Sequence, residues 1–288
     1  MYGTLVIAYL FLGGAAAGGF FMMAAWSLFF RRSDRTYRHV RAFESLRARM
    51  YTICLIMLAL ALLMLLWDLE YPHKALLVFL RPHATAITFG AYSLIALGLL
   101  GALLVLGALF RFRLGSGWIS RALEALCCVL SLAVMGYTGI FLASNPAVAF
   151  WNTGWLVVLF VCSSLSCGLS LLLLVDYFIK DQTLLLRAVR PLQGFHLACL
   201  AAEAASLVLF VNASFNNPDA GNAWALLLSP DMLSTALVGV VGFGIVIPAA
   251  LETYAITRKE CRTIPVSDAL CLCGGLCLRY CAIACGIQ

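Results

Sequence analysis

Residues 4–30 read TLVIAYLFLGGAAAGGFFMMAAWSLFF, and RRSDRTYRHVRAFESLRAR, residues 31–49, follows at once. The first segment carries no charged residue and exceeds the roughly 20 residues that a helix needs to cross about 30 Å of hydrocarbon. The second contains seven arginines. An apolar helix that leads into a basic segment is typical of a membrane span followed by a cytoplasmic loop.

The same alternation continues along the whole chain, which is 64% hydrophobic and 11% charged. Lipid offers no partners to backbone N–H and C=O groups, so spanning segments of this kind form helices. We therefore predict an all-α integral membrane protein with eight transmembrane helices. The expected spans cover about residues 4–30, 50–68, 85–110, 122–144, 153–176, 194–212, 232–256 and 267–287. They form a single polytopic membrane domain, residues 1–288, arranged as two four-helix bundles of about 4–144 and about 153–287.

The basic residues predict the orientation. Sixteen of the 19 Lys and Arg residues lie in every second loop, whereas the opposite loops hold only Lys74 and Arg81, and Arg279 lies inside the eighth span. Because basic loops stay in the cytoplasm, both termini are expected outside, in a protein of the cell (inner) membrane. The net charge of +6 is explained by this topology and does not indicate nucleic-acid binding.

Most of the twelve cysteines fall within predicted spans, where a thiol behaves as a small apolar residue. The last span places four of them on one stripe: Cys273, Cys277, Cys281 and Cys285. This stripe is about 18 Å long, too long for one iron–sulfur cluster to bridge from end to end. Small-residue helix packing is the default interpretation, and a metal bound by an adjacent pair with ligands from another helix stays open.

Three predicted outer loops are long enough to form a docking surface: residues 69–84, 145–152 and 213–231. The segments 75–80 and 224–228 within them suit short helices that lie flat at the interface. We take Trp151, Asn152 and His83 as candidate contacts of a peripheral partner on the periplasmic face. The alternative is that they are ordinary interfacial and turn residues.

A charge inside a membrane span is costly and is by default a functional candidate, and we single out four ionisable residues of the predicted spans. Glu203 lies in the middle of the sixth span and Arg279 in the outer half of the eighth. His196 and Glu252 lie nearer the cytoplasmic ends of the sixth and seventh, close enough to the interface to snorkel. The four are candidates for a proton path. The alternatives are a pair between Glu203 and Arg279, or a helix-to-helix hydrogen bond from a protonated Glu203 without a transport role.

Tyr9 and Tyr137 form a more specific pair, because the first helix runs inward and the fourth outward, which puts both about one to two turns below the outer surface. Beneath Tyr9, the segment GGAAAGG (13–19) permits either close helix approach or space for a ligand. A quinone head group needs an apolar slot with one or two donors for its carbonyl oxygens. We therefore predict quinone contacts at Tyr9, Gly13, Gly14, Tyr137 and the adjacent Thr138. The alternative is tyrosines of the aromatic belt.

A bis-His heme is excluded by the distribution of the histidines. His39 is expected in a cytoplasmic loop and His73 and His83 outside, which leaves only His196 in a span.

Several stretches taken together resemble the NrfD/PsrC family, the membrane-anchor subunits of polysulfide-reductase-type and related molybdoenzyme complexes. They occur in the family's order: residues 9–18 (YLFLGGAAAG), 68–82, 136–139 (GYTG), 150–153 (FWNT), 274–280 (GGLCLRY) and 286–288 (GIQ). Tyr137 matches the family's quinone-contacting tyrosine, with Thr138 beside it in the same motif. The chain departs from the family at Tyr9, where some members have His, and at 69–72, Leu-Glu-Tyr-Pro instead of the common Leu-Gly-Arg-Pro.

The resemblance implies a menaquinone or ubiquinone site near the outer face and a docked ferredoxin-like subunit with four [4Fe–4S] clusters. It also implies a catalytic subunit, often with molybdopterin, so that the metal cofactors belong to partners. The predicted function is a quinone-binding anchor that exchanges electrons with an outer-side iron–sulfur subunit, with proton translocation left open. A passive anchor without a quinone site is one alternative. A secondary transporter is the other, although Pro248 in the seventh span has no counterpart in the third.

Overall fold

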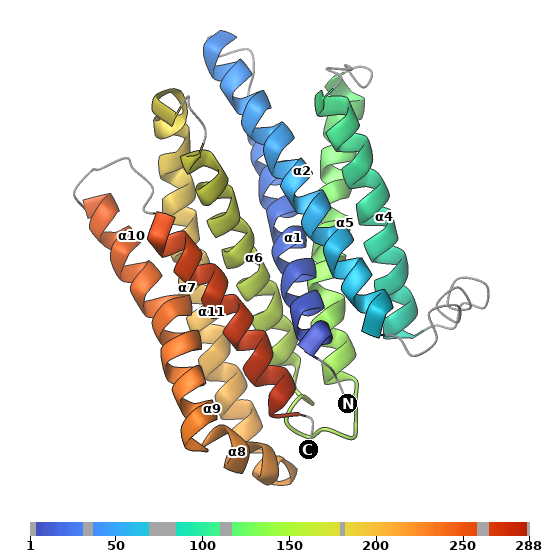
Figure 1. Ribbon diagram of the computed structural model, residues 1–288, viewed down its shortest axis with the longest axis vertical. Coiled ribbons are helices and arrows are strands. Elements are labelled where there is room, and N and C mark those ends of the chain that lie inside the picture. Colours follow the sequence, from blue (N-terminus) through green and yellow to red (C-terminus); the bar gives the residue numbers. More distant parts are fainter. Residues whose placement is uncertain are drawn as a thin grey trace.

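The computed structural model describes residues 4–30, 37–68, 85–109, 117–178, 182–257 and 265–286, and every regular element within these ranges is a helix (Figure 1). Eight helical spans there are long and apolar enough to cross a membrane. Seven of them are α1 (Thr4–Phe29), α2 (Tyr37–Asp68), α4 (Ala86–Leu109), α5 (Gly117–Ala143), α6 (Gly154–Tyr177), α7 (Gln182–Phe215) and α11 (Pro265–Ala284). The predicted all-α membrane fold with eight spans is confirmed.

The remaining span is composite. It consists of α9 (Pro230–Ser234), a π-helical segment η3 (Thr235–Val246) and α10 (Ile247–Thr257). A short 3₁₀ turn, η2 (Pro218–Ala220), and the helix α8 (Gly221–Leu227) precede it. The apolar segment 224–228 thus lies largely in a short helix, as predicted, whereas the segment 75–80 lies outside the described residues.

Two helices extend further than predicted at their N-terminal ends. The helix α2 begins at Tyr37, so His39 is helical and not part of a loop, and α7 begins at Gln182 and contains Pro191. In α2 the extension follows from an apolar stripe at helical spacing, whose buried members are Ala42, Phe43, Leu46 and Met50. Phe43 stacks on Phe30 with ring centroids 4.0 Å apart, which ties the extension to the end of α1.

The helix α1 lies at the centre of the molecule and packs against α2, α5, α6 and α11 (Figure 1). Both chain termini lie at the same end of the bundle, which we call the terminal end; the short helix α8 lies there too. Because α1 packs about as extensively against α6 as against α5, the division into two four-helix bundles stays a prediction.

Glycines bring α1 and α6 into backbone contact. A Cβ on Gly18 would lie 1.9 Å from the carbonyl oxygen of Ser164, and one on Gly168 would lie 2.1 Å from the carbonyl carbon of Gly18. Of the two interpretations of the 13–19 segment, close helix approach is the one that holds at Gly18.

The π-helical segment packs against α11 in the same way. A Cβ on Gly274 would lie 2.1 Å from Cα of Gly244, and one on Gly239 would lie 2.8 Å from Sγ of Cys277. The sulfur of Cys277 therefore fills space at a close helix contact, as the small-residue interpretation of the cysteine stripe expects.

Large apolar side chains cover the outer surface of the bundle; examples are Leu63, Leu99, Val129 and Val208, all exposed. A surface of this kind on eight spanning helices suits lipid and not water. The protein is therefore a multi-pass membrane protein.

Candidate functional site

Tyr137 on α5 is buried against the backbone of α4. A Cβ on Gly90 would lie 2.3 Å from the Tyr137 ring, so only glycine at that position lets the ring lie where it does. The tyrosine is 7% exposed, and its hydroxyl makes no hydrogen bond to any of the described residues. A buried hydroxyl without a partner is uncommon, and marks a place where a ligand or water can accept its proton.

The other members of the predicted quinone set are arranged less simply. Tyr9 is buried, and a Cβ on Gly13 would lie 3.9 Å from its ring, an ordinary contact. Gly14 faces elsewhere, because a Cβ there would lie 2.7 Å from both Arg279 Nη2 and Ser164 Oγ. Thr138 donates its hydroxyl to the carbonyl of Met135 at 3.1 Å within its own helix.

Tyr9 and Tyr137 lie at similar depths. At 1.5 Å per residue, Tyr9 lies about 8 Å along α1 from its start at Thr4. Tyr137 lies about 9 Å before the end of α5 at Ala143. Both of these helix ends are at the terminal end of the bundle. The two phenols therefore lie in the same half of the membrane span.

Arg279 is fully buried where α11 meets α1 and α6. Its guanidinium donates to the carbonyl oxygens of Leu10 (3.2 Å) and Gly275 (2.8 Å) and to the hydroxyls of Ser163 (3.2 Å) and Ser164 (2.8 Å). The rings of Phe11 and Phe160 lie 5.9 and 5.7 Å from it. The direct pair with Glu203, one of the alternatives for these residues, does not form among the described residues; neutral oxygens accept the hydrogen bonds of the guanidinium instead.

Glu203 on α7 is joined instead to a row of serines on α6. Its Oε2 accepts a hydrogen bond of 2.6 Å from Ser166, and Ser166 lies 3.7 Å from the sulfur of Cys271. The row has helical spacing and is buried throughout; its members are Ser163, Ser164, Ser166 and Ser170. The sequence shows this spacing directly, and it could have identified α6 as the polar face that the ionisable residues share.

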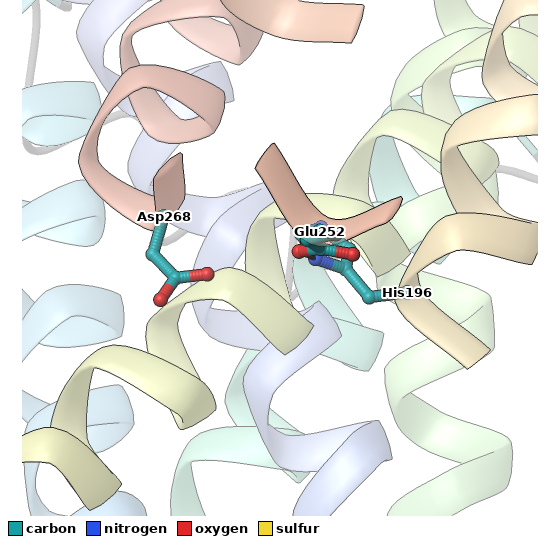
Figure 2. A group of neighbouring side chains, drawn as sticks. All are labelled: His196, Glu252 and Asp268. Atoms are coloured by element: carbon teal, nitrogen blue, oxygen red, sulfur yellow. Dashed lines mark hydrogen bonds and ion pairs between the residues drawn. The ribbon is translucent and has the colours of Figure 1, made fainter. Parts of the chain in front are cut away.

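The row ends at a cluster of three ionisable side chains, shown in Figure 2. His196 Nε2 lies 3.0 Å from Ser170 Oγ, and its Nδ1 is in contact with Glu252 Oε1. Asp268 of α11 completes the cluster, and one potential ligand atom from each of the three lies within 4.8 Å of the others.

The three residues of this cluster are at least 95% buried. The expectation that His196 and Glu252 snorkel to the interface is therefore wrong, because both turn inward to meet each other. Sequence reasoning missed Asp268, which lies inside the predicted eighth span and is as ionisable as the four residues singled out there.

The terminal end carries a platform formed by two loops. Asn217 donates to the carbonyl of Ala149 at 3.1 Å, and Phe150 packs edge-on against Phe210 and Trp224 with centroids 5.3 and 5.9 Å apart. These contacts join residues 145–152 to residues 213–231.

Of the predicted partner contacts, Asn152 is exposed on this platform. Trp151 is fully buried beneath it, and its indole N–H donates to the carbonyl of Ala282 at 2.7 Å. Its side chain thus fixes the platform to α11 from within and does not face outward. His83 lies outside the described residues.

The comparison with known proteins agrees with this architecture. The family model described as "Polysulphide reductase, NrfD" matches residues 1–288. The protein belongs to the NrfD family. Among characterised proteins, the C subunit of the polysulfide reductase of Wolinella succinogenes is 27% identical over 207 residues, which cover 66% of the present sequence and 65% of that protein. The match thus spans slightly less than two thirds of the length of this relative. The family match confirms the resemblance found in the sequence motifs.

Proposed function

We propose that this NrfD-family protein is the membrane anchor of a respiratory oxidoreductase complex. It binds menaquinone or ubiquinone in the half of the membrane next to the terminal end, and exchanges electrons with an iron–sulfur subunit docked on the platform. Family membership and the likeness to one subunit of a polysulfide reductase support an anchor role. The partners proposed from the family resemblance are a ferredoxin-like subunit with four [4Fe–4S] clusters and a molybdopterin-containing catalytic subunit.

The unpaired hydroxyl of Tyr137 is the observation that carries the quinone part of the proposal. Leaving such a hydroxyl buried and unpaired costs about 1–3 kcal/mol. A hydrogen bond from the hydroxyl to a carbonyl oxygen of a ligand would remove this cost. Quinone, when bound, supplies the two-electron chemistry. The protein supplies a donor at Tyr137, a second phenol at similar depth at Tyr9, and an apolar surrounding that excludes water.

Replacing Tyr137 by phenylalanine tests this role. Tyr137→Phe removes one donor and little volume, so quinol-dependent electron transfer by the purified complex should fall about tenfold, the value of one hydrogen bond of roughly 1.4 kcal/mol. Tyr51→Phe is the matched control, because the Tyr51 hydroxyl is also buried and without a partner among the described residues but lies toward the opposite end of α2. Equal rates for wild type and Tyr137→Phe would leave a passive anchor as the better description.

A proton route through the second half of the sequence is the other part of the proposal. Arg279 contacts Ser163, and Ser166 contacts both the Ser163 carbonyl and Glu203. The sulfur of Cys271 lies 3.7 Å from Ser166 Oγ and 3.8 Å from His196 Nε2, so polar contacts lead from the terminal half of the span toward the opposite end. Hydroxyl, carboxylate and imidazole groups can each pass a proton, and buried groups of this kind in membrane helices mark proton relays.

Glu203→Gln tests the route, because glutamine keeps the size of the side chain and its hydrogen bond with Ser166 but cannot carry a proton. In proteoliposomes containing the complex, proton translocation per electron should fall on the order of 100-fold while quinol oxidation continues. Asp176→Asn is the matched control: it neutralises another buried carboxylate of α6, whose Oδ1 has no hydrogen-bond partner among the described residues. If translocation survives in Glu203→Gln, or none is measured in the wild type, the route does not exist.

A further inference from the structure

The cluster of His196, Glu252 and Asp268 joins three helices at one point. His196 is on α7, Glu252 on α10 and Asp268 on α11. We propose that these three side chains bind one divalent transition-metal cation of the zinc type. The proposal is independent of the quinone site, which lies in the other half of the span.

The geometry of the three side chains is that of a converging ligand set. One nitrogen of His196 and one carboxylate oxygen each of Glu252 and Asp268 lie within 4.8 Å of one another. Figure 2 shows the Glu252 carboxylate overlapping the His196 ring, with one carboxyl oxygen of Asp268 on the side that faces them. Donor atoms bound to a single ion at about 2.0–2.2 Å lie about 3.3–3.6 Å apart in a tetrahedron, so small side-chain rotations would bring the three donors onto one ion.

With both carboxyl groups ionised and His196 neutral, the cluster carries an excess negative charge that a cation would balance. Two carboxylates are buried side by side, and neither forms an ion pair with a Lys or Arg among the described residues. Glu252 Oε2 is buried and has no hydrogen-bond partner there, although Oε1 contacts the imidazole. A divalent cation between two carboxylates and a neutral imidazole gives a net charge of zero, which is the state that costs least in the interior of a membrane protein.

The types of ligand select the class of metal. An imidazole with two carboxylates suits zinc and neighbouring first-row cations, whereas calcium and magnesium prefer oxygen ligands alone. The second nitrogen of His196, Nε2, lies 3.0 Å from Ser170 Oγ. That contact is the one a metal-binding histidine makes with its free ring nitrogen, and it orients the ring with Nδ1 toward the carboxylates.

A cation in this position and a proton relay through His196 exclude each other. The cation uses the Nδ1 lone pair, which a relay needs for passing a proton to Glu252. A bound cation would therefore block the proposed proton route at His196. It would also link α7, α10 and α11 through one metal ion.

Metal analysis of the full-length protein in detergent tests the proposal. After incubation with Zn²⁺ and removal of free metal, we expect about one zinc per molecule and an X-ray absorption spectrum with a nitrogen and oxygen shell at about 2.0–2.1 Å. Glu252→Gln and Asp268→Asn should each lower the zinc affinity at least 100-fold, and Ser170→Ala about 10- to 100-fold. Asp176→Asn, at a buried carboxylate outside the cluster, should leave it unchanged.

The cysteines provide the most demanding control, because thiols also bind zinc. A sulfur shell at about 2.3 Å would assign the metal to cysteine and overturn the proposal. Less than about a tenth of an equivalent of zinc in the wild type, or retention of zinc by the folded double variant of Glu252 and Asp268, would overturn it as well. The absorption spectrum of the wild type decides the question even if the variants fail to fold.

Discussion

At position 279 a guanidinium lies fully buried, and it forms no ion pair with a carboxylate of the described residues. Four neutral oxygens from α1, α6 and α11 accept hydrogen bonds from it, and two aromatic rings flank it. Gly14 leaves the space that the guanidinium fills. The guanidinium therefore joins three helices by hydrogen bonds, because its five N–H donors lie in a rigid plane and reach acceptors in several directions at once.

Arg279→Lys should destabilise the protein although the formal charge is kept. An ammonium has three donors and no planar fork, so at least one charge-assisted hydrogen bond is lost, at a cost of about 1.5–3 kcal/mol. Thermal unfolding in detergent, followed by circular dichroism, measures the change. Arg121→Lys, at an exposed position of α5, is the control and should unfold at the wild-type temperature. Equal midpoints for the two variants would show that the hydrogen bonds of Arg279 contribute nothing.

At the scale of single residues, the sequence identifies which groups are unusual but not what they contact. Glu203, Arg279, His196 and Glu252 are conspicuous because ionisable residues are rare in apolar spans. Their partners depend on how the helices are rotated against each other, which single-helix patterns do not contain. For this reason the sequence left open whether Glu203 pairs with Arg279, and in the structure serines of α6 bind each of the two.

At the scale of helices, Gly168 controls the distance between α1 and α6. A Cβ there would meet backbone atoms of Gly18 and Gly19 at 2.1–2.6 Å, and backbone atoms cannot rotate away. Gly168→Ala should therefore push the two helices apart and cost about 1–3 kcal/mol.

The same thermal unfolding assay compares Gly168→Ala with Gly136→Ala. Nothing lies within 4 Å of a Cβ on Gly136, and alanine favours a helix over glycine by about 1 kcal/mol, so this control should unfold at or above the wild-type temperature. A Gly168→Ala protein as stable as wild type would mean that α1 and α6 do not pack through their glycines.

The sequence predicts helices better than their irregularities. The spans follow from length and hydrophobicity, because lipid permits little else. The N-terminal extension of α2 was missed because its arginines were assigned to a loop, although buried Phe43 and Leu46 continue the apolar stripe. The π-helical segment has no clear signal beyond glycines at 239, 242 and 244, since it depends on how tightly α11 packs against it.

At the scale of the whole molecule, the number and order of the spans could be read from hydrophobicity alone, but their packing could not. The helix α1 is central because its small residues let several neighbours approach it. The proposed quinone site and the ionisable cluster then fall in different parts of the bundle, with Tyr137 against α4 and His196 against α6 and α10. This separation allows electron exchange and cation or proton chemistry to be tested independently by mutation.

The last prediction concerns which end of the bundle faces the outside of the cell. Both termini lie at the terminal end, whereas α2 and α5 begin at the opposite end with exposed Arg38, Arg41, Arg49 and Arg121. Basic residues are retained in the cytoplasm, so the terminal end with its platform should face outward. Alkaline phosphatase, which folds only outside the cytoplasm, should be active when fused after Gln288 and inactive when inserted between Arg258 and Arg262. Green fluorescent protein should show the reverse pattern. Fluorescence from the fusion after Gln288 would place the platform in the cytoplasm, and an iron–sulfur partner would then have to dock there.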